Sequence, residues 1–241
     1  MKHKSPSNSQ WIWGTHAVFA ALKNPDRTCE KIILTQETLA ELDSELLSVC
    51  PHQILERREM DRLLPAGAVH QGIALKAKNL PQMAIEDVIV DLDDNDLLLI
   101  LDHVTDPQNV GAILRTCAAF QVRALIMTDR NAPPLNGALA KTACGALERV
   151  PVIFVTNLAR TLETLRKNNI WVIGLAEEGE KTLGETNLPG KKAIVMGAEG
   201  EGMRRLTREY CDILAKLPTN PDFPTLNVSV AAGLSIYVLR G

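Results

Sequence analysis

Aromatic side chains are scarce in this chain of 241 residues, and at 4% they argue against recognition of bases or flat ligands by stacking. The five cysteines include no Cys-x-x-Cys pair, which disfavours zinc and dithiol motifs and predicts buried free thiols in a reducing compartment. No apolar run approaches the roughly 18 residues of a membrane-spanning helix, and the N-terminus lacks the apolar segment of a signal peptide. These absences predict a soluble, cytoplasmic protein.

The charge of the chain is unevenly distributed. Its formal net charge of −3 gives no sign of an overall basic surface. The acids are concentrated, however, because residues 81–96 contain six of them and no base. The rest of the chain is slightly positive, so the composition remains compatible with local basic patches.

The acidic stretch also marks a change in pattern. Before it, the sequence predicts helices over residues 15–23 and 39–47 and strands over 31–35 and 73–77, which together indicate a small α/β unit. The predicted organisation is a disordered tail at residues 1–9, a small α/β domain at 10–78, an acidic linker at 79–96 and a larger α/β domain at 97–241.

Short apolar runs alternate with helical patterns throughout the larger domain. The predicted strands cover residues 97–101, 124–127, 152–155, 171–174 and 193–196, and the helices lie near 110–120, 137–147, 157–168, 203–210 and 228–238. The first run is continuously apolar, as expected for a strand that is covered on both faces. This pattern predicts a parallel α/β sheet, whose ligands bind beyond the carboxyl ends of the strands.

Polar residues 102–109 follow the first of these strands, and Arg115 lies six residues into the helix that is predicted to begin near Asn109. Asn109 could simply cap that helix, and Arg115 could be a solvated surface residue. The alternative is that both belong to a site at the end of the strand. His103 has no cysteine or second histidine at ligand spacing, so no metal is predicted.

A glycine-rich turn, from Gly197 to Gly202, directly follows the predicted strand at 193–196. A plain strand-to-helix turn would also use glycine. If the turn binds a ligand, a phosphate group is disfavoured, because no Gly-Lys-Ser/Thr ending is present and Glu199 and Glu201 would repel a pyrophosphate. A neutral or positively charged ligand that carries an adenosine fits better.

The third polar cluster is a proline-rich loop at residues 217–227, which leads into the last helix. Asn227 and Ser229 could be plain caps of that helix. The small residues at positions 229 and 231–233 predict a close contact with another helix or a loop.

Together, the strings at residues 106–115, 196–202 and 226–231 resemble the SpoU (TrmH) family of RNA ribose 2′-O-methyltransferases, in the SPOUT superfamily. The resemblance covers about residues 97–241. The preceding segment, with residues 13–18 and 70–73, looks like the small L30e-like RNA-binding domain of the longer members. The arrangement is similar to that of the subgroup that methylates guanosines of 23S rRNA.

The resemblance implies a deep trefoil knot in the C-terminal domain, binding of S-adenosylmethionine, and a homodimer formed through that domain. The family's active-site residues match Asn109, Arg115, Glu199 and Asn227. The positions that hold the methyl donor match Gly197, Leu217 and Leu226. No metal is implied.

Three positions depart from the family pattern. Members usually have glycine and serine where this chain has Pro221 and Asp222, and serine where it has Thr225. Thr225 retains a hydroxyl group, whereas Pro221 and Asp222 change the loop and its expected contacts with RNA.

Other functions remain open at this point. The same chemistry could act on tRNA, although the tRNA enzymes of the family have short helical extensions in place of an N-terminal domain. A non-catalytic RNA-binding factor in ribosome assembly could keep the same fold. A Rossmann-type oxidoreductase is disfavoured because no G-x-G-x-x-G follows the first strand of the larger domain.

Overall fold

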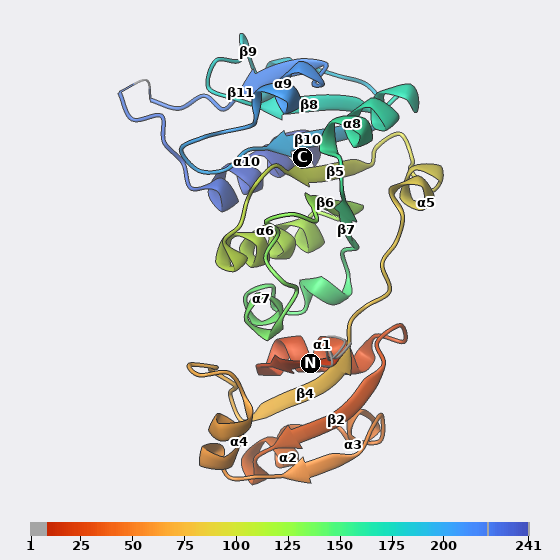
Figure 1. The fold of residues 1–241 in the computed structure, drawn as a ribbon, viewed down its shortest axis with the longest axis vertical. Coiled ribbons are helices and arrows are strands. Elements are labelled where there is room, and N and C mark those ends of the chain that lie inside the picture. The colour runs from red at the N-terminus through yellow and green to blue at the C-terminus, as the bar shows by residue number, and fades with distance from the viewer. Residues whose placement is uncertain (1–8, 221, 241) are drawn as a thin grey trace, which may run out of the picture. The chain divides into compact units, whose positions relative to one another are not determined.

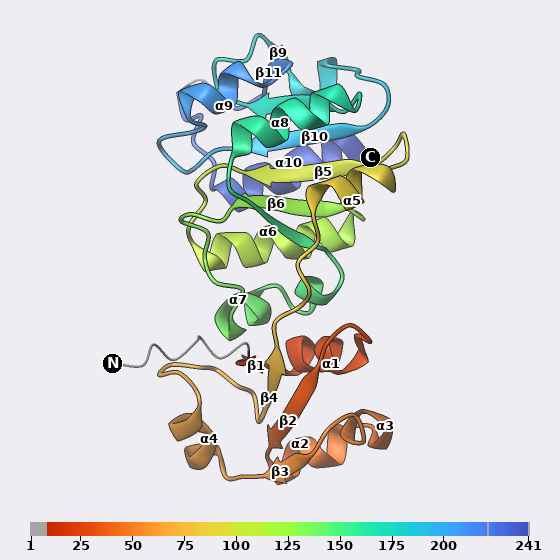
Figure 2. The same ribbon diagram turned by 45° about the vertical axis from the view of Figure 1, so that its right-hand side comes forward.

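The computed structural model describes residues 9–220 and 222–240, and Figures 1 and 2 show its ribbon from two directions. The chain forms two compact units. The N-terminal unit comprises the chain up to Pro81 together with Pro134–Glu148, and the C-terminal unit comprises Gln82–Pro133 and the chain from Arg149 onwards.

The N-terminal unit is built on a four-stranded sheet in the order β1-β4-β2-β3. Its strands are β1 (Ser9–Trp13), β2 (Cys29–Leu34), β3 (His52–Ile54) and β4 (Ile73–Lys78). Its first four helices are α1 (Thr15–Lys23), α2 (Gln36–Glu41), α3 (Ser44–Leu47) and α4 (Arg57–Leu63) (Figure 1). The helix predicted at residues 15–23 is confirmed. The helix predicted at 39–47 is two short helices, because Leu42 is extended and Asp43 caps α3 through the backbone N–H of Glu45.

Two faces of this sheet bury different sets of side chains. Because directly opposed residues of antiparallel strands point to the same side, Ile12 of β1 and Leu75 of β4 share one face, and both are fully buried. On the other face, Trp13 and Ala74 form a core with Met60 of α4. Ser9, predicted to lie in the tail, is the first residue of β1.

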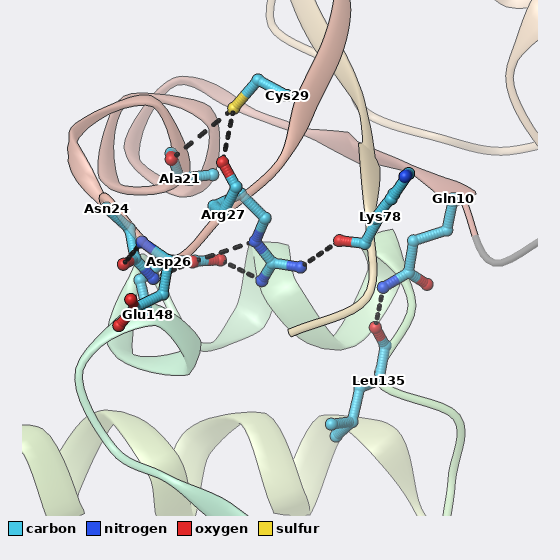
Figure 3. A network of polar contacts seen from close by, with 9 residues as sticks. All are labelled: Gln10, Ala21, Asn24, Asp26, Arg27, Cys29, Lys78, Leu135 and Glu148. Atoms are coloured by element: carbon cyan, nitrogen blue, oxygen red, sulfur yellow. Dashed lines mark hydrogen bonds and ion pairs between the residues drawn. The ribbon is translucent and has the colours of Figure 1, made fainter. Parts of the chain in front are cut away.

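The segment Pro134–Glu148 belongs to the N-terminal unit, so the prediction that it lies in the larger domain is wrong. It contains α7 (Gly137–Thr142) and the short 3-10 helix η1 (Ala146–Glu148). A buried ion pair joins it to the connection between α1 and β2: Arg27 Nη2 lies 2.5 Å from Glu148 Oε1, and the two side chains are 1% and 4% exposed. Arg27 also donates to Lys78 O, and Asn24 donates to Glu148 Oε2 (Figure 3).

The C-terminal unit contains a seven-stranded sheet in the order β7-β6-β5-β10-β8-β11-β9, and all neighbouring strands are parallel. The strands are β5 (Leu97–Leu101), β6 (Ala124–Thr128), β7 (Val152–Val155), β8 (Trp171–Leu175), β9 (Lys181–Thr182), β10 (Lys192–Met196) and β11 (Ile213–Lys216). The predicted parallel α/β sheet is therefore confirmed. Every residue of β5 is buried, in agreement with its continuous apolar sequence.

Helices cover both faces of this parallel sheet (Figure 2). They are α5 (Ile85–Val90), α6 (Pro107–Ala119), α8 (Leu158–Lys167), α9 (Arg205–Glu209) and α10 (Val228–Arg240), with the 3-10 helix η2 (Leu183–Glu185). The helices α5 and α8 share one core with Leu98 and Ile100 of β5. The helix α10 packs on α6, where a Cβ atom at Gly233 would lie 3.9 Å from Thr116 Cγ2. This contact confirms the one predicted from the small residues of α10.

Helix α5 lies inside the segment predicted to be an acidic linker. Ile85, Val88 and Ile89 are buried in the core of the C-terminal unit. Their spacing of three and four residues places them on one face of a helix. The acids that dominate the composition of this segment conceal this apolar face in the sequence.

The five cysteines are free thiols. Cys50 and Cys117 are buried as predicted, and burial raises the pKa of the Cys117 thiol to about 12. Cys144 is exposed instead. Among the described residues, no helix is long and apolar enough to cross a membrane. The same residues contain no group of three or more His, Cys, Asp or Glu side chains that could hold a metal ion.

Candidate active site

The three polar clusters of the sequence follow strands β5, β10 and β11 of the C-terminal unit. These strands run parallel in one sheet, so their carboxyl ends lie along the same edge. The loops that follow them therefore emerge at the same end of the sheet, where parallel α/β sheets bind their ligands, although β8 lies between β10 and β11.

A buried carboxylate ties the first two loops together. Asp102 follows β5 directly and is fully buried. Its two oxygens accept hydrogen bonds from the backbone N–H of Arg204 (3.0 Å) and from Arg204 Nε (2.8 Å). The next residue, His103, has a positive φ of 61°, an uncommon conformation for a residue with a side chain. The buried position of Asp102 is not evident from the polar sequence of residues 102–109, where its only signal is an acid directly after a fully apolar strand.

Asp106 rather than Asn109 caps α6. Asp106 Oδ1 accepts the N–H of Gln108 at 3.0 Å, and the helix begins at Pro107. Asn109 therefore lies in the first turn of α6, where its side chain is available for other contacts. Arg115 is six residues further along the same helix, about 9 Å along the axis, and is exposed.

The glycine-rich turn after β10 folds back on itself. Ala198 and Gly202 exchange two backbone hydrogen bonds, of 3.2 and 2.9 Å. A Cβ atom at Gly197 would lie 2.1 Å from Gly202 C, so only glycine fits there. Gly200 has a φ of +79°, and a Cβ atom at that position would meet nothing within 4 Å. The turn therefore has a compact base at residues 197, 198 and 202 and an open tip at Gly200. Glu199 lies between the two.

Glu199 is the centre of a hydrogen-bonded cluster that joins all three loops. Its Oε1 accepts from Asn227 Nδ2 (2.6 Å), from Val228 N (3.1 Å) and from Asn109 Nδ2 (3.4 Å). Asn227 Nδ2 also donates to Asn109 Oδ1 at 3.0 Å. Three of the four predicted active-site residues are thus in direct contact, although they are up to 118 positions apart in the chain.

Asn227 has two roles in this arrangement. Its Oδ1 accepts from the backbone N–H of Ser229 (2.9 Å) and from Ser229 Oγ (2.5 Å), which caps the start of α10. Its amide group meanwhile bridges Asn109 and Glu199. The predicted cap is therefore confirmed, and the same side chain contacts two other predicted site residues.

The cluster leaves one carboxylate oxygen for a ligand. Within the described part of the chain, all the hydrogen bonds to the Glu199 carboxylate end at Oε1, and none ends at Oε2. Glu199 is exposed, so Oε2 can accept a proton donor of a bound molecule or face a positive charge.

The remaining predicted site residues lie on the third loop. Leu217 and Leu226, at its two ends, are half-buried, and Thr225 is exposed. The backbone N–H of Asp222 donates to Asn220 Oδ1 at 3.0 Å. Pro221, the other departure from the family pattern, lies outside the described residues.

Comparison with protein families matches both parts of the chain. Residues 96–237 match the SpoU rRNA Methylase family, and residues 11–83 match the family described as RNA 2′-O ribose methyltransferase substrate binding. The chain belongs to the SpoU rRNA methylase family. It is an S-adenosylmethionine-dependent RNA 2′-O-methyltransferase.

Two similar SpoU relatives are bacterial proteins named 23S rRNA (guanosine-2′-O-)-methyltransferase RlmB. The one from Salmonella typhi is 44% identical over 239 residues, and the one from Escherichia coli K12 is 43% identical over 240 residues. Each alignment covers 95% of this chain and 97% of the relative. Among solved structures, the SpoU methyltransferase AviRb from Streptomyces viridochromogenes, in complex with AdoMet, has a TM-score of 0.82 and covers 97% of this chain and 89% of its own. At 16% identity, that likeness shows the fold alone.

The site fits the methyl donor of the SpoU family. The open tip at Gly200 lets a ligand approach the backbone without meeting a side chain. The half-buried Leu217 and Leu226 offer apolar surface. The Glu199 carboxylate is complementary in charge to a sulfonium cation. Gly197 has a different reason to be glycine, because a Cβ atom there would strike the turn itself before it reached any ligand.

Proposed function

We propose that this protein methylates the ribose 2′-hydroxyl of a guanosine in 23S rRNA and acts in the cytoplasm. The observation that carries the proposal is the similarity to the RlmB relatives over 97% of their length, which includes both the N-terminal domain and the three loops of the site. The alternative of a tRNA substrate has less support, because the relatives that match 95% of this chain, N-terminal domain included, are named as 23S rRNA enzymes.

In the proposed reaction, S-adenosylmethionine supplies a methyl group on a positively charged sulfur. Gly197, Leu217 and Leu226 hold the donor. Asn109, Asn227 and Glu199 fix the three loops relative to one another, so that the ribose hydroxyl can be aligned with the methyl carbon. Such alignment of two reactants contributes most of the acceleration that a displacement of this kind needs.

Arg115 anchors a phosphate of the RNA next to the reacting ribose. It cannot act as a free base, because the pKa of a guanidinium group lies above about 12. Its planar group can instead form two parallel hydrogen bonds to the phosphate and stabilise negative charge on the 2′-oxygen. The proton of the 2′-hydroxyl then passes to the RNA phosphate.

Substitution of Arg115 tests this mechanism. We expect Arg115→Lys to keep the fold and the affinity for S-adenosylmethionine but to lower single-turnover methyl transfer by about 100-fold, the scale on which one preorganised donor contributes. Lysine keeps the charge but loses the planar fork. Arg115→Ala should be at least as slow. Methyl transfer by Arg115→Ala at the wild-type rate would contradict the mechanism.

Transfer of a tritiated methyl group to three RNAs tests the substrate. Naked 23S rRNA, assembled large subunits and tRNA are offered separately, and the product is digested to nucleosides. The expected product is 2′-O-methylguanosine in 23S rRNA. Methylation of tRNA alone would replace the proposed substrate. Tight RNA binding without transfer to any of the three would favour a non-catalytic assembly factor.

We further propose a homodimer formed through α10. Its exposed apolar side chains are Val230 (50%), Leu234 (46%), Tyr237 (61%) and Val238 (42%). Their spacing of three, four and seven residues puts them on one side of the helix. Sedimentation should give twice the mass of the chain for the wild type and a monomer for Leu234→Glu. The control Val90→Glu changes an 82% exposed residue of α5 and should remain a dimer. A monomeric wild type at micromolar concentration would contradict the proposal.

We also propose that residues 10–78 form an RNA-binding domain and that residues 97–241, apart from the segment 134–148 that packs in the N-terminal unit, form a methyltransferase domain with a trefoil knot. The acidic segment between them contains α5, which packs in the C-terminal unit.

A further inference from the structure

The N-terminal unit contains a cavity of about 320 Å³ next to two of the three tryptophans of the chain. It is lined by Gln10, Trp11 and Trp13 of β1, by residues 65–68 after α4, and by residues 136–138 at the start of α7. All of these belong to the same compact unit. The chain is poor in aromatics, so their concentration in one cavity is not expected from the composition.

The two tryptophans differ in how much of their surface remains available. Trp13 is 6% exposed and is part of the core that includes Met60. A Cβ atom at Gly137 would lie 2.2 Å from the Trp13 ring, so the backbone of α7 already lies against it. Trp11 is only half-buried. The ring of Trp11 can therefore contact a ligand, whereas Trp13, which also lines the cavity, is held in the core of the unit.

Positive charge lies beside Trp11 on the same face of the sheet. In the strand register, Trp11 is opposite Lys76 of β4, and Lys76 is opposite Lys31 of β2. Directly opposed residues of antiparallel strands point to the same side, so these three side chains form one row across the sheet. Both lysines are exposed. Lys78 follows Lys76 by two residues and therefore lies on the same face. It is opposite Ser9 in the strand register, and the hydroxyl of Ser9 donates to Glu30.

Polar groups at the rim of the cavity can contact the edge of a planar ligand. The Oδ1 atom of Asn136 accepts from the N–H groups of Ala138 and Leu139. Its Nδ2 group can therefore donate to a ligand. Gln10 Nε2 donates to Leu135 O at 2.5 Å (Figure 3), which leaves its Oε1 as an acceptor for a ligand. Gly67, with a φ of +79° and open space around it, places no side chain across the rim.

We propose that this cavity binds one unstacked base of single-stranded RNA. The base stacks on Trp11, and the adjoining phosphates lie over Lys76 and Lys31. An aromatic face beside a basic strand surface is the combination by which proteins bind single-stranded RNA. A volume of about 320 Å³ is at the lower end of the 300–1,000 Å³ range of small-ligand sites, which suits one base rather than several. The inference rests on the proposed RNA substrate and adds a second point of contact outside the methyl-transfer site.

Tryptophan fluorescence tests the site in the full chain. A Trp171→Phe background removes the third tryptophan, which lies on β8, so that the emission comes from Trp11 and Trp13 alone. The probe is a mixed-sequence single-stranded RNA of 12 nucleotides, without S-adenosylmethionine. We expect it to quench the emission, and a duplex of the same sequence to quench it much less, because paired bases cannot enter the cavity.

Substitutions separate stacking from charge. Trp11→Ala should weaken binding of this RNA by about 5- to 150-fold, the range for loss of one base stack, whereas Trp11→Phe should retain most of the affinity. Lys76→Gln leaves the core unchanged. It should reduce the magnitude of the slope of log K, the RNA association constant, against log salt concentration by about 0.7. The matched control Lys23→Gln changes an exposed lysine of α1 that does not line the cavity and should leave the slope unchanged.

The outcomes distinguish this inference from the proposed function. Unchanged RNA affinity in folded Trp11→Ala, or equal salt slopes for Lys76→Gln and Lys23→Gln, would overturn the base site even if the wild type methylates 23S rRNA. Conversely, binding of RNA that depends on Trp11 and Lys76 would support the site even if 23S rRNA receives no methyl group.

Discussion

The two units of this protein use their polar side chains in opposite ways. The N-terminal unit buries a charged pair, Arg27 and Glu148, whose side chains are at most 4% exposed. The C-terminal unit leaves its cluster of Asn109, Glu199 and Asn227 open at the ends of the strands, and both Glu199 and Asn227 are exposed. The buried pair holds two distant chain segments together, whereas the open cluster can still accept a ligand. In this protein, the buried polar contact stabilises the fold, whereas the exposed polar contacts remain available for function.

The largest expected effect comes from breaking the buried pair. Glu148→Gln should lower the free energy of unfolding of the N-terminal unit by about 3 kcal/mol or more, because it leaves the charge of Arg27 buried without a counter-charge. Denaturant unfolding followed by tryptophan emission in the Trp171→Phe background measures this unit.

The matched control is the exposed pair of Arg57 and Glu37, whose side chains are 59% and 78% exposed. Glu37→Gln should change the stability by less than about 1 kcal/mol, as is usual for a surface ion pair. Equal effects of Glu148→Gln and Glu37→Gln would show that burial does not set the contribution of these pairs.

The next largest effect concerns the open cluster and falls on the reaction rather than on stability. Asn227→Ser should lower single-turnover methyl transfer by about 100-fold. Serine can still cap α10, so its stability should stay close to that of the wild type, but it cannot bridge Asn109 and Glu199.

Asn220→Ala serves as the control for Asn227→Ser, because Asn220 is an exposed asparagine in the same loop that contacts Asp222 instead of the cluster. It should retain the wild-type rate. If Asn227→Ser transfers methyl groups as fast as Asn220→Ala, the cluster has no part in the reaction.

The smallest expected effect separates two glycines with the same backbone conformation. Gly200 and Gly190 have φ values of +79° and +76°, and a Cβ atom at either would meet nothing within 4 Å. Alanine at each should cost about 1 kcal/mol of stability, because of the left-handed conformation. Calorimetry should show weaker binding of S-adenosylmethionine only for Gly200→Ala, since Gly200 is at the tip of the candidate site. Equal affinities in the two variants would place the donor elsewhere.

Local patterns in the sequence predict much of the C-terminal sheet. The apolar runs of β5, β6, β7, β8 and β10 are continuous, so each indicates a buried strand without any knowledge of its neighbours. The strand β9 is missed because it has only two residues, and β11 is missed because only one of its four residues is buried. In the N-terminal unit, β3 is missed because none of its three residues is buried, and β1 is missed because only its last two residues are buried.

For the candidate site, the three motifs and their order are visible in the sequence because each directly follows a strand or begins a helix. The sequence also predicts, correctly, that the glycines of the second motif form the turn after a strand. It does not show that Asp102 bonds to Arg204, since hydrogen bonds between residues about a hundred positions apart leave no periodic signal.

By itself, the sequence determined the parallel α/β architecture, the family and the residue types of the site, because apolar periodicity and short motifs are local properties of the chain. Only the tertiary structure decided that Glu199 is the centre of the cluster, that residues 134–148 belong with the N-terminal unit, and that Trp11 and Trp13 line a cavity. Each of these depends on which distant segments pack together. That choice follows from the free energy of burying their side chains jointly, which no single segment of the sequence contains.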